Sequence, residues 1–162
     1  MSASAVRSRS LEIRVALLVL FVGMSVLLET VFHLPVRMPG HRAFPTAVSI
    51  LLFADTFGAG LLLPFAVVIP AIMYALGMNT PLMVISWVIP AAVLMIPAVR
   101  KRQESVVICI AVGVIAGLSR FLALDFGVHK QSEAIRLAGH ASFGVLGGLT
   151  AWAALKAVPR KE

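Results

Sequence analysis

Charged residues and cysteine are both scarce in this chain. Of its 162 residues, 13% are charged and 60% are hydrophobic, and there is a single cysteine. Soluble domains average about 25% charged and about 45–50% apolar residues, so the composition excludes an ordinary soluble domain. One cysteine cannot form an internal disulfide, and Cys109, inside an apolar run, is expected to be a small buried hydrophobe.

Catalytic motifs are also missing from the sequence. It contains no nucleophile elbow, no HExxH, no P-loop and no pair of aspartates with metal-ligand spacing. The formal net charge is +7, but no basic run is interleaved with aromatic residues, which argues against nucleic-acid binding. We therefore predict a protein that is not an enzyme and has no cofactor, no metal site and no nucleic-acid partner.

The apolar residues are gathered into long blocks, and the mean hydropathy is +0.99. Such blocks indicate that lipid surrounds the chain. They predict an all-α integral membrane protein, a six-helix transmembrane bundle in one domain, 15–156, between a segment 1–14 and a tail 157–162. Prolines, glycines and charged runs divide the blocks into expected helices at 15–34, 43–56, 59–77, 81–99, 105–123 and 137–156. Pro90 and Pro97 predict kinks in the fourth helix.

The distribution of Lys and Arg predicts the orientation of the bundle. Under a six-span topology, nine Lys and Arg residues fall on the side of the two termini and four on the other, with Arg120 inside a helix. Because cytoplasmic loops accumulate Lys and Arg, we expect both termini in the cytoplasm and a multi-pass location in the cell inner (plasma) membrane. Residues 1–28 resemble a signal peptide, but no small-x-small cleavage site follows, so an uncleaved first helix is expected.

Two pairs of ionisable residues have the spacing of helix neighbours near the outer face. Glu29 and His33 are four residues apart, as are Asp125 and His129. A carboxylate and an imidazole on one face could coordinate a metal. They could equally form a local hydrogen-bonded couple, which the lack of a third clustered ligand favours.

Arg120 is the strongest candidate for binding an anion, because guanidinium matches carboxylate and phosphate geometry. Its place late in the fifth helix also allows its side chain to extend to the membrane interface. Trp87 is either an interfacial anchor or part of a pocket lining. Asp55 is interpreted as a helix cap at a cytoplasmic turn.

Small residues predict close helix packing. Gly113 and Gly117 form one small-xxx-small pair, and Gly144 and Gly148 form another. His140 shares the face of Gly144, so its side chain is expected to point at a neighbouring helix. Packing, a hydrogen bond and ligand contact remain open for His140.

The chain resembles the substrate-binding S components of energy-coupling factor vitamin transporters. The resemblance covers the six-span architecture, the Pro-Gly-His-Arg loop at 39–42 and the glycine-rich segment that begins at His140. It implies a ligand site near the outer face made by Arg37, His41, Trp87, Arg120, His129 and His140. It also implies a transmembrane coupling subunit with ATPases as a partner, although residues 15–34 lack the Ala-x-x-x-Ala pattern by which that family often docks. The start Met1-Ser2-Ala3 lacks the Met-His motif of the metal-transporting branch.

Two functions follow from these observations. The first is a membrane-embedded substrate-binding subunit of an importer for a vitamin or cofactor precursor, in contact with the lipid bilayer and a small-molecule ligand. The alternative is a non-transport membrane scaffold or assembly protein that binds another protein through its small-residue helix faces. A membrane enzyme that uses Asp55 is a weaker third reading.

Overall fold

Helices account for all regular secondary structure in the described part of the computed structural model, residues 11–33, 38, 40–124 and 133–157. This confirms the prediction of an all-α chain for those residues. The elements are α2 (Leu11–His33), α3 (Ala43–Phe57), the 3-10 turn η1 (Ala59–Leu61), α4 (Leu62–Ala75), α5 (Met83–Met95), α6 (Pro97–Arg100), α7 (Val106–Leu124) and α8 (Glu133–Ala157).

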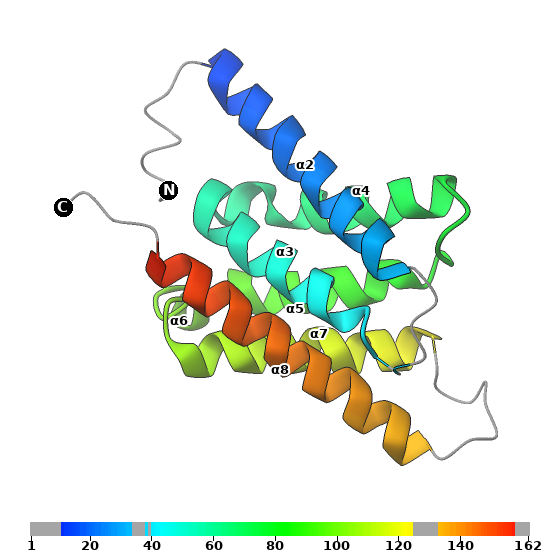
Figure 1. Ribbon diagram of the computed structural model, residues 1–162. Coiled ribbons are helices and arrows are strands. Elements are labelled where there is room, and N and C mark those ends of the chain that lie inside the picture. The colour runs from blue at the N-terminus through cyan, green and yellow to red at the C-terminus, as the bar shows by residue number, and fades with distance from the viewer. Residues whose placement is uncertain (1–10, 34–37, 39, 125–132, 158–162) are drawn as a thin grey trace.

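Successive long helices run antiparallel to one another, so that residues distant in sequence lie together at each end of the bundle (Figure 1). We call the end where α2, α4 and α7 finish and α3, α5 and α8 begin the His41 end. The other end carries the turn after α6 and is called the Arg100 end. α3 is central, since it contacts α2, α4, α5, α7 and α8.

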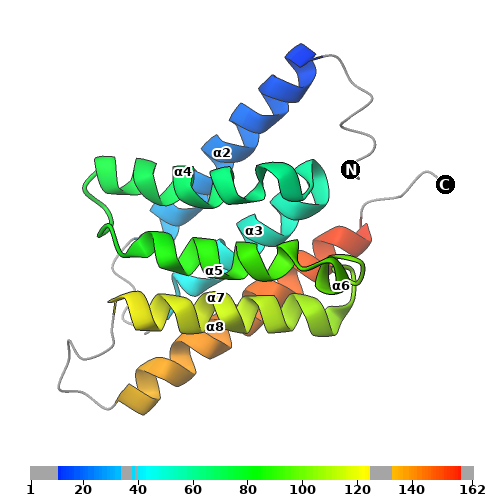
Figure 2. The same ribbon diagram turned by 180° about the vertical axis from the view of Figure 1, so that it is seen from behind.

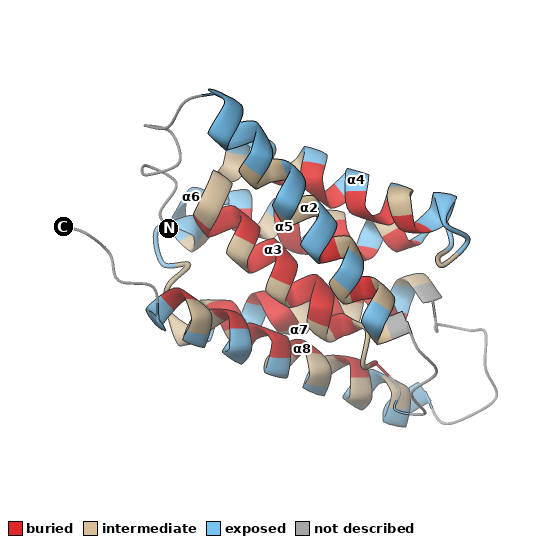
Figure 3. Cartoon of the chain, turned by 45° about the horizontal axis from the view of Figure 1, so that its top comes forward, coloured by how far each residue is buried: buried red, intermediate tan, exposed pale blue. Residues whose placement is uncertain are grey.

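α2 is the helix least covered by the rest of the chain. It contacts mainly α3 and α4, and its N-terminal half projects away from the bundle (Figures 1 and 2). Figure 3 shows the exposed colour along much of its length. In an 18-residue apolar segment of Leu11–Phe32 only 11% of the residues are buried, against 50% in Val106–Ala123 of α7.

These two stretches are long and apolar enough to cross a membrane. The shorter apolar helices are Ala43–Phe57, Ala59–Ala75 and Met83–Met95. Length and composition therefore give two membrane-capable helices among the described residues, a test that the core helix of a soluble protein or a signal sequence also passes.

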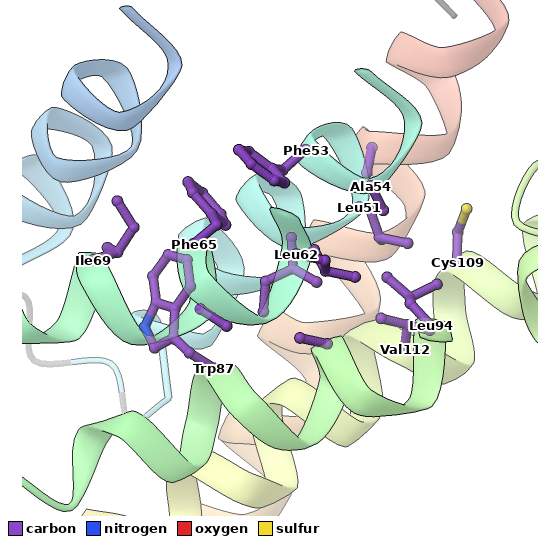
Figure 4. Packing of buried hydrophobic residues seen from close by; sticks show 14 of the residues in the cluster. Leu51, Phe53, Ala54, Leu62, Phe65, Ile69, Trp87, Leu94, Cys109 and Val112 are labelled. Atoms are coloured by element: carbon purple, nitrogen blue, oxygen red, sulfur yellow. The ribbon is translucent and has the colours of Figure 1, made fainter. Parts of the chain in front are cut away.

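Aromatic side chains join α3, α4 and α5 in the buried core (Figure 4). Phe53 of α3 stacks on Phe65 of α4, with ring centroids 3.9 Å apart. Trp87 of α5 meets the edge of Phe65 at 5.8 Å and is fully buried. Trp87 is therefore a core residue here, not an exposed anchor.

Glycines bring α7 and α8 into backbone contact, as the sequence predicts. A Cβ added to Gly113 would lie 2.1 Å from the backbone oxygen of Gly144, and one added to Gly148 would lie 2.3 Å from that of Cys109. Real Cβ atoms essentially never come so close. The two small-residue pairs therefore face each other inside the chain.

The predicted fourth helix, 81–99, is broken rather than kinked. α5 passes through Pro90 without ending, but Ile96 is extended, with φ −61° and ψ 121°, and α6 begins at Pro97. Proline disfavours the helical conformation in the residue before it, which accounts for the break at Ile96. α8 begins at Glu133, four residues before its predicted start, and α2 begins at Leu11 instead of residue 15.

Candidate functional site

Arg120 and Glu29 form a buried ion pair between α7 and α2. The Nη1 of Arg120 lies 3.2 Å from Oε1 of Glu29, and Nη2 lies 3.4 Å from Oε2. The side chains are 0% and 1% exposed. This two-point contact matches the fork geometry of guanidinium to the plane of a carboxylate.

Thr46 of α3 completes the cluster. Its hydroxyl accepts a hydrogen bond from Arg120 Nη1 at 2.9 Å and donates one to Glu29 Oε1 at 2.8 Å. Glu29 and Arg120 each lie four residues before the end of their helices, and Thr46 lies three after the start of its own. The cluster thus joins three helices about one turn inside the His41 end.

The ion pair with Glu29 limits which groups the guanidinium of Arg120 can still bind. The sequence leaves open whether its side chain extends to an interface or binds an anion. In the structure the guanidinium is enclosed, and its two terminal nitrogens already contact Glu29. Only Nε has no hydrogen-bond acceptor among the described residues.

Trp87 presents a second buried hydrogen-bond donor at a similar depth from the His41 end. It lies four residues after the start of α5, as Arg120 lies four before the end of the antiparallel α7. Its Nε1 is buried and has no acceptor in the described part of the chain. Figure 4 shows this nitrogen on the edge of the ring turned away from Phe65. A buried N–H without an acceptor costs about 1–3 kcal/mol, so both donors require an explanation.

His41 ties the loop before α3 to the end of α2. Its Nδ1 lies 2.6 Å from the carbonyl oxygen of Met38, and Nε2 lies 2.8 Å from that of Phe32. Which of the two ring nitrogens donates depends on the tautomer. His41 therefore holds the position of the loop through backbone oxygens.

We expect His41→Ala to lower the free energy of unfolding by about 1–2 kcal/mol, because the contacts of the ring with the carbonyl oxygens of Met38 and Phe32 are lost. Unfolding in mixed detergent and SDS micelles measures this change. His41→Gln retains one amide donor and should recover part of the loss. Equal stability of His41→Ala and the unchanged chain would show that the two short contacts do not hold the loop.

His140 lies inside the bundle, two turns into α8. It is 3% exposed, and its ring meets the edge of Phe121 of α7 at 5.9 Å. A Cβ on Gly40 would lie 2.2 Å from its backbone nitrogen, so the loop before α3 rests on α8 at this point. The expectation that His140 points at a neighbouring helix is confirmed.

Arg37 and His129 lie outside the described residues, as does Asp125, and the side chain of His33 is not described. The proposed Glu29–His33 and Asp125–His129 pairs therefore stay predictions, although both oxygens of Glu29 are turned to Arg120. Within the described ranges, no three His, Cys, Asp or Glu side chains gather as metal ligands.

The interpretation of Asp55 as a helix cap is wrong. Asp55 lies within the last turn of α3, largely buried, and its Oδ1 accepts a hydrogen bond from Gln103 Nε2 at 3.3 Å. Gln103 follows α6, so this contact closes the Arg100 end. A carboxylate near a helix C-terminus faces the negative end of the helix dipole, which makes an external donor necessary.

Comparison with known proteins supplies no relative. No known protein family, curated protein or solved structure matches the chain. The described cluster offers hydrogen bonds and an ion pair but no arranged nucleophile and base.

Proposed function

We propose that this chain is a multi-pass protein of the inner (plasma) membrane that binds a small molecule between its helices at the His41 end. The proposal takes α2, α3, η1 with α4, α5 with α6, α7 and α8 as six spans with both termini in the cytoplasm. The weak cover of α2 supports it, because apolar side chains along that helix need lipid or protein around them.

The observation that carries the proposal is the pair of buried donors, Trp87 Nε1 and Arg120 Nε. Each lies about one turn inside the same end, on helices in contact with each other. A ligand with acceptor oxygens would satisfy donors that the described residues leave unpaired. Glu29 neutralises Arg120, so the proposed ligand need not be an anion.

The wider role that we propose is a substrate-binding subunit of an importer, similar to an energy-coupling factor S component. The sequence contains no P-loop, so transport would need an energy-supplying partner. A transmembrane coupling subunit with ATPases is the partner that the sequence resemblance implies. Arg37, His41, His129 and His140 remain proposed ligand residues together with Trp87 and Arg120.

The alternative is a membrane scaffold that binds a partner through its small-residue faces. Gly113, Gly144 and Gly148 are covered by the contact of α7 with α8, and Gly147 by α3. These faces are therefore occupied within the chain, which makes the binding subunit the better supported function. Crosslinking mass spectrometry in native membranes separates the two, because only an importer subunit predicts crosslinks to an ATPase module.

Fluorescence of Trp87 tests ligand binding directly. The chain has two tryptophans, so Trp152→Phe leaves Trp87 as the only reporter. We expect one compound from a vitamin and nucleobase panel to change its emission saturably. In the otherwise unchanged chain, Trp87→Phe keeps an aromatic ring beside Phe65 but removes the N–H. This variant should weaken ligand binding about fivefold to tenfold.

Isothermal titration calorimetry measures the affinity of Trp87→Phe, and Trp152→Phe serves as the matched control with unchanged affinity. A panel in which no compound binds would contradict the proposed function, and so would binding that an Arg120 substitution leaves unchanged. Equal affinities of the Trp87→Phe and Trp152→Phe variants would remove Trp87 from the site.

A further inference from the structure

An apolar groove of about 320 Å³ lies between α2 and α3. Leu20, Met24 and Leu28 line it from α2, and Val48 and Leu52 line it from α3. Neither Trp87 nor His140 is part of its lining, so the groove is separate from most of the site proposed above. Its volume is within the range of small-molecule sites.

Two serines give the groove its only unusual chemistry. Ser25 of α2 and Ser49 of α3 both line it, and each is 3% exposed. Helical hydroxyls commonly donate to the carbonyl oxygen one turn earlier, and Thr30, Thr56 and Ser119 do so here at 2.6–2.8 Å. Neither Ser25 nor Ser49 makes a hydrogen bond to any residue that the structure describes.

The serines extend the polar cluster inward along the groove. Ser25 lies four residues before Glu29 on α2, and Ser49 lies three after Thr46 on α3, so each pair shares a helix face. No charged residue lines the groove. At the far end of the groove the rings of Phe21 and Phe57 pack edge to face, with their centroids 5.8 Å apart.

Depth decides between a bilayer lipid and another occupant. Ser25 is eight residues from the end of α2 and Ser49 is six from the start of α3, which places them about 9–12 Å inside the His41 end. In the membrane location proposed above, that is well inside a hydrocarbon core of about 30 Å. The ester and headgroup oxygens of phospholipids lie at the interface, so an acyl chain would leave both hydroxyls unpaired.

We propose that the α2–α3 groove binds a neutral, largely apolar small molecule that carries one hydrogen-bonding group, an alcohol or a carbonyl. Its apolar body fills the space between Leu20, Met24, Val48 and Leu52. Its oxygen exchanges hydrogen bonds with Ser25 and Ser49, each of which can donate or accept. Weak contact between α2 and the bundle gives such a molecule access from the side.

Photolabelling with a diazirine analogue of farnesol, an acyclic apolar alcohol, tests this proposal in phosphatidylcholine nanodiscs. We expect saturable labelling of α2 and α3 peptides that contain groove residues, with competition by unlabelled farnesol and much weaker competition by the matching hydrocarbon, farnesene. Ser25→Ala with Ser49→Ala should weaken labelling about tenfold. Ser119→Ala, which removes a hydroxyl already bonded to Ile115, is the matched control and should change nothing.

Several results would overturn the proposal. They are labelling that does not saturate or spreads over all exposed helix surfaces, equal competition by farnesene, and labelling that survives the double serine substitution. Val48→Phe fills the groove and leaves both serines unsubstituted, and it should also abolish labelling if the groove is the site. A retained Trp87 fluorescence response would then show that only this proposal has failed.

Discussion

Replacing Glu29 by Gln is expected to destabilise the protein by about 3–5 kcal/mol, one of the two largest effects predicted for this chain. The substitution keeps the shape of the side chain but leaves the Arg120 guanidinium buried beside a neutral amide. An uncompensated buried charge costs far more than a buried pair contributes. Reversible unfolding in mixed detergent and SDS micelles measures the loss.

Two variants control this experiment. Glu12→Gln removes an exposed carboxylate from the start of the same helix and should change stability by less than about 0.5 kcal/mol. The double variant Glu29→Leu and Arg120→Met replaces both charges by apolar groups and should regain most of the loss. If Glu29→Gln behaved like Glu12→Gln, the ion pair would not hold α2 to the bundle.

The second large effect is expected from Gly144→Ala. The new Cβ would lie 2.2 Å from the backbone oxygen of Gly113, so α7 and α8 must move apart along their contact. Overpacking of this kind costs about 1–3 kcal/mol and sometimes more, and we expect about 3 kcal/mol because the obstacle is backbone. The same unfolding titration measures it.

Gly23→Ala is the matched control for Gly144→Ala. Nothing lies within 4 Å of the position of its Cβ, and alanine is the better helix former by about 0.5–1 kcal/mol. The two glycine-to-alanine changes should therefore have opposite signs. Destabilisation of similar size at both positions would contradict the close contact with Gly113 as the cause of the Gly144→Ala effect.

Local sequence signals were sufficient to place most helices. Apolar runs are bounded by Pro, Gly or charged residues, and these limits depend on residues close together in the chain. The glycine contact could also be predicted, because the pairs at Gly113 and Gly144 lie on faces that only a close backbone can cover. The all-helical architecture follows from the same signals.

The partner of Glu29 could not be found from local spacing. Its four-residue distance to His33 favours a local couple, whereas in the structure the carboxylate contacts Arg120, 91 residues away. That contact depends on how α2 and α7 are rotated and tilted. A signal was nevertheless present, because Glu29 and Arg120 are charges within apolar stretches and such charges need a partner.

The burial of Trp87 and the break at Ile96 are two further features that local sequence signals do not predict. Tryptophan suits both an interface and a core, so only the packing of α5 on α4 decides that Trp87 is enclosed. Pro90 and Pro97 carry the same local signal, yet α5 continues through one and ends before the other. The local signal of a proline therefore does not by itself distinguish a helix that continues from one that ends.

Native mass spectrometry of the chain extracted from its own membranes tests most directly whether the protein holds a small molecule between its helices. We predict a peak heavier than the bare chain by the mass of one small organic molecule, retained in Trp152→Phe and diminished in Trp87→Phe. The bare mass alone in all three preparations, with every variant folded, would contradict the account.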